Sequence, residues 1–383
     1  MVPTRTDLER PPRRRRRSMW SRGARDGATL PAGTVLAVML VAAIIAMFVN
    51  ADATLRKSEA KRNNPRWRTD IARDVADVAD ALGLTAPRTA MDDAMGRHSS
   101  SLTPEQVLAR QRAAQARGTG GSTTTTSPSA VPHLRAPTPA APLKLWVGGD
   151  SVTETFGTQL VRVSESTKLF DTTLDFHVST GLSVPTYFNW PLHLAQDVIP
   201  KVDPDVVVIM FGANDGQNIL MPDGSILTAF SPPWQEEYAK RVGAVMDLLR
   251  SPTNDRIVMW AGPPPMGPET GTHGMDLISH IDWLEARSRP WVHYVDTWVY
   301  FSDTHLQFEH YLPSATGELR GLRQKDDIHM SDIGGTWLSW IVLRDLGRYV
   351  DLRAARAHPD PNDLPPPSVE ERRVVPPRVP GAI

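Results

Sequence analysis

One short stretch of the chain, residues 143–153, constrains the fold more than any other. It opens with Leu-Lys-Leu-Trp-Val, an apolar run with aromatic and β-branched content, which is typical of a buried strand in a parallel sheet. Gly148 and Gly149 then allow the backbone to turn sharply, and Asp150 and Ser151 are residue types that begin helices. We therefore expect a strand, a tight turn and a helix, with Ser151 beyond the end of the strand. A hydroxyl there is either a helix cap or a nucleophile, because open α/β sheets bind ligands at the carboxyl ends of their strands.

Strand and helix signals continue to alternate along the chain as far as residue 350. The strongest is the buried-strand run Val-Val-Val-Ile-Met-Phe at residues 206–211. Five expected strands joined by helical crossovers predict an α/β fold, a three-layer doubly wound parallel sheet of the flavodoxin-like type with strand order 2-1-3-4-5. The expected strands cover residues 143–147, 173–178, 205–211, 256–261 and 291–295, and the later helices cover residues 192–199, 234–249, 276–287 and 331–349.

This topology gathers candidate catalytic residues at one edge of the sheet. Strands one and three are neighbours in the expected order, so Ser151 and Asn214, each just beyond the carboxyl end of one of them, face the same crevice. Gly181, beyond the second strand, flanks that crevice from the other side. Nucleophilic catalysis also needs a base, and His329 stands immediately before the last expected helix. Taken one at a time, each of these residues also fits a structural role in a turn or at a helix terminus.

Four short blocks, in chain order, carry a family resemblance. The blocks are Gly149-Asp150-Ser151, Gly181, Gly212-x-Asn214-Asp215 and Asp326-x-x-His329. Together they resemble the blocks of the SGNH (GDSL-type) hydrolase superfamily, over residues 144–350 and including Gly334, five residues after the histidine. The chain departs from the family pattern at Val152, where the family usually has leucine or a similar residue.

The resemblance implies acyl-transfer chemistry carried by a Ser-His-Asp triad. Ser151 would attack an ester carbonyl, His329 would accept its proton, and Asp326 would hold the imidazole in the required tautomer. The backbone N–H groups of Ser151 and Gly181 and the side-chain amide of Asn214 would form the oxyanion hole. No organic cofactor and no metal ion are implied.

The front of the chain predicts a membrane anchor. Residues 1–29 are polar with an arginine run at residues 13–17, and residues 30–49 are uncharged, apolar and long enough to span a bilayer. We expect a basic cytoplasmic tail and one transmembrane helix, with the rest of the chain on the extracytoplasmic side of the cell membrane. A cleaved signal peptide is the alternative, because Ala-Asp-Ala at residues 51–53 has the form of a cleavage site and would release a secreted protein.

Residues 50–117 are expected to form a stalk with short helices. One of them begins at Thr103, which is followed by Pro104 at the first helical position and by Gln106 at the third. The other is an amphipathic helix whose apolar positions are Ile71, Val75, Val78 and Leu82.

The remaining boundaries follow from shifts in composition. Residues 118–142 are rich in Gly, Thr and Pro and predict a linker. The hydrolase-like domain is expected at residues 143–350. Residues 351–383 are rich in Pro and Arg with few large apolar side chains, which predicts a disordered tail.

Composition excludes several other classes of function. The chain has no cysteine, which rules out disulfides, thiolate metal sites and a cysteine nucleophile. The net charge of −1 gives no reason to expect a nucleic-acid partner. His305, Glu309 and His310 lack the spacing of a zinc protease, so no metal site is predicted from them. Trp190 and Trp234 stand in Pro-rich, loop-like contexts and are candidate platforms for a sugar ring.

The sequence therefore predicts a membrane-anchored, extracytoplasmic serine esterase of bacterial type. Its expected substrate is an acyl ester of a cell-envelope carbohydrate or lipid, and the sequence indicates no particular protein partner. An O-acyltransferase using the same site is one alternative, and a non-catalytic envelope-binding module is another. Within the site, Asp327 is the alternative to Asp326, although we expect it to be solvated or to bind the loop backbone.

Overall fold

The computed structural model of the protein describes residues 31–61, 64–86, 88, 90, 102–118, 131–253, 255–270 and 273–372. The chain divides into two compact units, Met1–Met47 and Phe48–Ile383. Helix α1 (Ala32–Val49) lies mostly in the first unit, and none of its residues is buried. It is long and apolar enough to cross a bilayer, by length and composition, as a signal sequence would also be. The expected basic tail, residues 1–29, lies outside the described residues.

The second unit is built on a five-stranded parallel sheet. Its strands are β1 (Leu143–Gly149), β2 (Phe170–Phe176), β3 (Val206–Met210), β6 (Ile257–Ala261) and β7 (Val292–Val295). Their order is β2-β1-β3-β6-β7, which confirms the predicted doubly wound α/β arrangement. The second strand begins three residues earlier than predicted, because Phe170 pairs with Leu143 at the start of β1.

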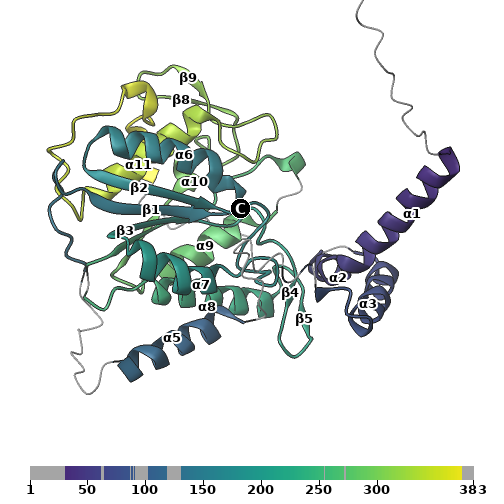
Figure 1. Cartoon of the computed structure of the whole chain (residues 1–383). Coiled ribbons are helices and arrows are strands. Elements are labelled where there is room, and N and C mark those ends of the chain that lie inside the picture. The colour runs from purple at the N-terminus through teal and green to yellow at the C-terminus, as the bar shows by residue number, and fades with distance from the viewer. Residues whose placement is uncertain are drawn as a thin grey trace, which may run out of the picture. The chain divides into compact units, whose positions relative to one another are not determined.

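Helices cover both faces of the sheet (Figure 1). One face carries α6 (Ser151–Ser166) and α11 (Asp332–Leu346). The other carries α7 (Trp190–His193), α8 (Pro232–Leu248) and α9 (Met275–Ala286). This is the three-layer order expected when successive right-handed crossovers start on opposite sides of the first strand.

Short elements interrupt the regular alternation, mainly in the loops beyond the strands. The chain continues from α7 through a π-helical segment, η1 (Leu194–Val202), with Pro200 inside it. A small hairpin, β4 (Ile219–Leu220) and β5 (Ile226–Leu227), follows β3. Beyond β6 and β7 lie η2 (Pro268–Thr270), α10 (Thr297–Tyr300) and a second hairpin, β8 (Tyr311–Pro313) and β9 (Leu319–Gly321).

The helix predicted to begin near Thr103 belongs to the body. It is α5 (Pro104–Gly118), and its start is a reciprocal cap: the Gln106 N–H donates to Thr103 Oγ1 at 3.3 Å, and the Thr103 N–H donates to Gln106 Oε1 at 3.0 Å. Val107 and Leu108 are buried in the main core. Residues 102–118 are therefore part of the packed domain, which begins well before residue 143.

A helical hairpin follows the apolar helix, and it is closed by alanines. Helices α2 (Ala51–Ala60) and α3 (Arg66–Ala81) pack through Ala51, Ala76 and Ala79. The apolar face predicted for α3 was wrong at most of its positions. Helix α3 packs on α2 through the neighbouring stripe of alanines, whose small side chains allow the two helices to approach closely. Of the four predicted positions, Ile71 is 56% exposed, Val78 48% and Leu82 65%, while Val75 packs on the alanine cluster.

The C-terminal segment also differs from its prediction. Residues 351–372, expected to be disordered, lie against the body and include η3 (Pro361–Asp363) and α12 (Ser368–Arg372). The Ala315 N–H donates to the Leu364 carbonyl at 2.9 Å, and Val369 is 4% exposed within the core. Side-chain contacts also hold this segment, including an ion pair between Arg344 and Glu370 and a hydrogen bond from Ser314 to Asn362. Its prolines reduce the entropy that ordering it costs. Residues 373–383 lie outside the described residues.

Two tryptophans that the sequence offered as sugar platforms lie in the core instead. Trp190 and Trp234 are both 0% exposed. Each satisfies its indole N–H inside the protein, Trp190 on Thr180 Oγ1 at 2.8 Å and Trp234 on the Gln217 carbonyl at 2.7 Å. Trp190 lies edge-on to Trp146 of β1, and Trp234 stacks on Tyr238 of α8, so neither ring is free for a sugar and the platform prediction was wrong.

Candidate active site

The turn between β1 and α6 places Ser151. Asp150, and not Ser151, is the helix cap: its Oδ1 accepts the Val152 N–H at 2.9 Å. Gly149 has a φ of +153°, and a Cβ there would lie 2.0 Å from the Met210 carbonyl oxygen of β3. The Thr153 hydroxyl donates to the same carbonyl at 3.0 Å. The turn is thus fixed to the neighbouring strand, and the Ser151 hydroxyl is left available for another partner.

That partner is His329, on the loop before α11. The distance between Ser151 Oγ and His329 Nε2 is 3.0 Å, and that between His329 Nδ1 and Asp326 Oδ2 is 2.6 Å. The structure therefore brings together the three predicted triad residues, although Ser151 and His329 are 178 positions apart in the chain. The arrangement is a hydroxyl hydrogen-bonded to an imidazole that a carboxylate orients, which is the geometry of an activated nucleophile.

The Asp326 carboxylate is itself held by the loop. Its Oδ1 accepts the backbone N–H groups of Ile328 and His329, both at 3.0 Å. Burial acts to raise the pKa of Asp326, but the hydrogen bonds from His329 and Ile328 outweigh it and hold that pKa below its usual value. The carboxylate therefore remains ionised and faces the imidazole over a wide pH range.

Asp327 points elsewhere. Its backbone has a φ of +56°, and its Oδ1 lies 2.9 Å from His310 Nδ1. Its carbonyl accepts the Gly267 N–H at 3.0 Å, as expected of a residue that binds the loop backbone. Of the two adjacent aspartates, only Asp326 contacts His329 in the part of the chain that the structure describes.

The three oxyanion-hole candidates lie at the same edge of the sheet. Gly149 pairs with Phe176 of β2 on one side and with Met210 of β3 on the other, so the loops after all three strands start side by side. The Ser151 N–H is on the first turn of α6, where backbone donors have no partner within the helix. The Asn214 amide donates to Asp150 Oδ2 at 3.4 Å, beside the nucleophile turn.

Gly181 is held in place by a buried acid. A Cβ on Gly181 would lie 2.5 Å from Asp215 Oδ1, so only glycine fits this approach. The same oxygen accepts the N–H groups of Leu182 and Ser183 at 2.6 and 2.8 Å. Asp215, the last residue of the third sequence block, therefore ties the loop after β2 to the loop after β3.

Two fully buried carboxyl groups, Asp150 and Asp215, lie beneath the site. Burial raises the pKa of Asp150 to about 7, with a further contribution from Asp215, against hydrogen bonds from Val152 and Asn214. Burial also raises the pKa of Asp215, against the N–H groups of Ser183 and Leu182. Both groups favour the neutral form more than a solvated aspartate does.

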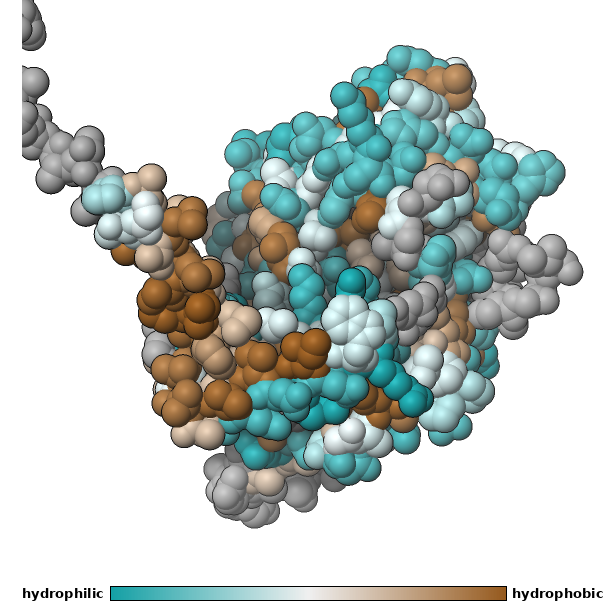
Figure 2. Space-filling model, turned by 90° about the vertical axis from the view of Figure 1, so that its right-hand side faces the viewer, coloured by the Kyte–Doolittle hydropathy of each residue, from teal (hydrophilic) through white to brown (hydrophobic). Residues whose placement is uncertain are grey.

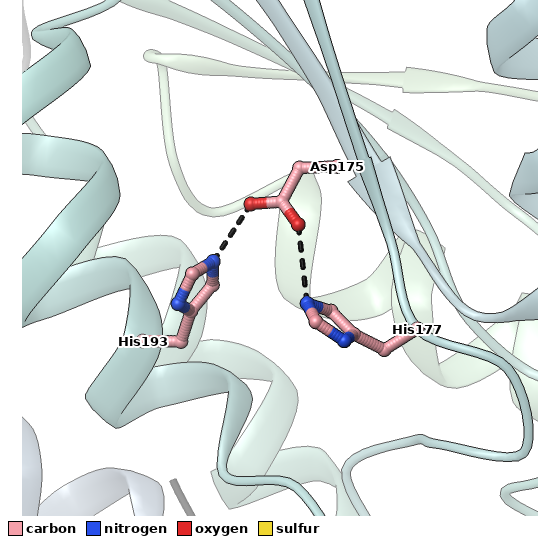
Figure 3. A group of neighbouring side chains, drawn as sticks. All are labelled: Asp175, His177 and His193. Atoms are coloured by element: carbon pink, nitrogen blue, oxygen red, sulfur yellow. Dashed lines mark hydrogen bonds and ion pairs between the residues drawn. The ribbon is translucent and has the colours of Figure 1, made fainter. Parts of the chain in front are cut away.

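The residues that could hold a metal are not those considered from the sequence. His310 is engaged with Asp327, and the described residues do not gather His305, Glu309 and His310 into one site. A different cluster does form, from Asp175, His177 and His193 (Figure 3). Sequence reasoning missed it, although the alternation of Asp175 and His177 puts both on one face of the expected strand.

A small cavity lies next to the end of β2. It has a volume of about 190 Å³ and is lined by residues of β2 and of the loop that follows it. Tyr187, on its rim, is 41% exposed, unlike the buried tryptophans. The lining residues are Phe176, His177, Val178, Thr180, Tyr187 and Phe188.

The model of the family described as "Protein of unknown function (DUF459)" matches residues 144–345. No curated protein matches the chain in sequence. Among solved structures the chain is similar to a carbohydrate acetylesterase from Sinorhizobium meliloti, at 15% identity over 54% of this chain and 99% of that one, with a TM-score of 0.36. An acetylxylan esterase from Geobacillus stearothermophilus is similar at 16% identity over 56% and 97%, with a TM-score of 0.36.

A gut microbial diltiazem-metabolizing enzyme is similar at 12% identity over 57% of this chain, with a TM-score of 0.36. The matched region is 49% of that protein, about half of its length.

The buried acid beneath the nucleophile generates a prediction for stability. The Asp150 carboxyl has an ordinary pKa of 3.8 but one of about 7 in the folded protein, so between these values the folded state binds one more proton than the unfolded chain. The free energy of unfolding therefore falls as pH rises from about 4 to 7, and this group contributes a slope of about −1.4 kcal/mol per pH unit. We expect Asp150→Asn, whose oxygen still caps Val152, to lack that part of the slope. Urea denaturation of the full chain at several pH values measures it, and equal slopes in the two proteins would contradict the assignment.

Proposed function

The chain belongs to the family described as a protein of unknown function (DUF459), and we propose that this member is a serine esterase. The observation that carries the proposal is the continuous hydrogen-bond chain from Ser151 through His329 to Asp326, at 3.0 and 2.6 Å. Structural roles for these residues would not require the hydroxyl and the carboxylate to meet the two nitrogens of one imidazole. The SGNH-type block order supports the same function.

The proposed reaction has two acyl-transfer steps. His329 Nε2 accepts the Ser151 proton as Oγ attacks the ester carbonyl, and Asp326 stabilises the imidazolium that forms. The developing oxyanion is stabilised by the N–H groups of Ser151 and Gly181 and by the Asn214 amide. His329 then returns the proton to the leaving alcohol. In the second step it activates a water molecule, which hydrolyses the acyl-enzyme and regenerates Ser151.

We place this reaction outside the cytoplasmic membrane, on an acyl ester of the cell envelope. The support is α1, which has the length and composition of a bilayer-spanning helix. The motif at residues 51–53 lies within α2, and Ala51 is 1% exposed against Ala76 and Ala79 of α3. Cleavage there would cut the packed hairpin, which favours an uncleaved anchor over a signal peptide.

Cell fractionation with an antibody to the chain tests whether the anchor is kept. We expect the protein in the membrane fraction, and recovery from the soluble fraction alone would contradict the anchor.

Hydrolysis of short-chain p-nitrophenyl esters by the full chain in detergent is the direct test of activity. The full chain is required because α5 and residues 351–372 pack on the body. We expect turnover in the wild type and a loss on the order of 10³-fold or more in Ser151→Ala, because the nucleophile is removed. Asn214→Ala should lose about 10²–10³-fold, the usual cost of one oxyanion donor. A wild type as inert as Ser151→Ala on esters of several acyl lengths would contradict the esterase proposal.

The two neighbouring aspartates provide a matched pair of variants. We expect Asp326→Ala to lower kcat by about 10³–10⁴-fold, because the imidazole loses the carboxylate that orients it. Asp327→Ala removes a carboxylate of the same loop that faces His310 instead, so its kcat should stay close to that of the wild type. Equal losses in the two variants would show that the loop matters as a whole and would remove the specific role of Asp326.

A further inference from the structure

Three potential metal ligands converge at the carboxyl end of β2. Figure 3 shows the Asp175 carboxylate between the rings of His177 and His193. Asp175 Oδ1 lies 3.2 Å from His177 Nε2, and Asp175 Oδ2 lies 2.7 Å from His193 Nε2. One donor atom from each residue lies within 4.8 Å of the others. Asp175 lies in β2, His177 directly follows that strand, and His193 is the last residue of α7, so the fold brings the cluster together from separate elements.

The spacing of these atoms suits a small metal ion. In a tetrahedral zinc site with ligand distances of about 2.0–2.1 Å, neighbouring donor atoms are roughly 3.3 Å apart. The two contacts of Asp175, at 3.2 and 2.7 Å, use different oxygens of its carboxylate, and one donor atom from each of the three residues lies within 4.8 Å of the others. For all three groups to contact one ion, donor atoms that are at most 4.8 Å apart would adjust to that spacing.

The ligands are oriented by groups outside the cluster. His193 Nδ1 lies 3.2 Å from Asp197 Oδ2, so a carboxylate holds the nitrogen that faces away from Asp175. Metal-binding histidines are commonly oriented in this way, by a carboxylate on the second ring nitrogen. The His177 ring is stacked on Phe188, with centroids 3.8 Å apart and planes at 25°. Both imidazoles are therefore held in place before any ion binds.

The cluster is also accessible. The side chains of His177, Asp175 and His193 are 31%, 23% and 13% exposed, so an ion can reach the cluster from solvent. We propose that Asp175, His177 and His193 bind one divalent transition-metal ion of the zinc class. Two imidazoles and one carboxylate suit Zn²⁺ and its neighbours, whereas Ca²⁺ and Mg²⁺ prefer all-oxygen sites.

The position of the site relates it to the candidate active site. The His177 N–H donates to the Gly149 carbonyl at 3.0 Å, next to the nucleophile turn. The His177 carbonyl accepts the Thr180 hydroxyl at 2.6 Å, so the same residue begins the loop that carries Gly181. A bound ion fixes the end of β2 against α7 and thereby stabilises both segments. Metal binding itself does not depend on the esterase reaction.

Metal titration of the full chain tests the proposal. The protein is purified in detergent with a histidine-free tag, stripped with a chelator and titrated with Zn²⁺ by calorimetry and with Co²⁺ by visible absorption. We expect one ion per chain and a Co²⁺ spectrum of low coordination number. Asp175→Asn and His193→Gln should abolish saturable binding, and Asp197→Asn should weaken it by about 10–100-fold, because it alters only the group that orients His193.

Two controls separate this site from other effects. His133→Gln removes an exposed histidine elsewhere, and Ser151→Ala removes the candidate nucleophile, so both should bind Zn²⁺ as the wild type does. Circular dichroism shows whether each variant is folded. No stoichiometric binding by the wild type, or equal affinity in the wild type and Asp197→Asn, would overturn the proposal and leave an ion-pair cluster only.

Discussion

The placement of Ser151 depends on one buried carboxyl group, that of Asp150. Because Asp150 caps α6 through the Val152 N–H, the neighbouring serine does not have to, and its hydroxyl meets His329. The second oxygen of Asp150 accepts the Asn214 amide and so links the ends of β1 and β3. Burying this carboxyl is unfavourable for its charged form, which is why its pKa is raised. The fold thus accepts a local cost in stability in order to fix the geometry of the nucleophile.

The other side of the site is held by a buried arginine. Arg323 is 3% exposed, and its guanidinium donates to the carbonyls of Pro265 at 2.6 Å and of Ile328 at 3.4 Å. Burial lowers the pKa of Arg323 to about 9, against the attraction of Asp327 and Asp326. The guanidinium therefore connects the loop after β6 to the loop that carries the histidine. Both the nucleophile and its base are positioned by polar groups within the protein interior.

The parts of this structure that the sequence predicted are those governed by local patterns. Apolar runs such as residues 206–211 and the glycines that end them mark the strands, and the strand order then brings Ser151 and Asn214 to one edge. The meeting of His329 with Ser151 needed the family resemblance, because no local pattern reports a contact across so much chain. The sequence did not predict that residues 351–372 are ordered or that His193 lies beside Asp175. Both depend on contacts with segments that are distant in the chain.

Covalent labelling asks directly whether Ser151 is a nucleophile that His329 activates. An organophosphonate that reacts with activated serines is added to the full chain, and the modified peptide is identified by mass spectrometry. We expect one adduct per chain, on the peptide that contains Ser151, and no adduct in His329→Ala. Labelling of a different serine, or labelling of Ser151 that is undiminished in His329→Ala, would contradict it.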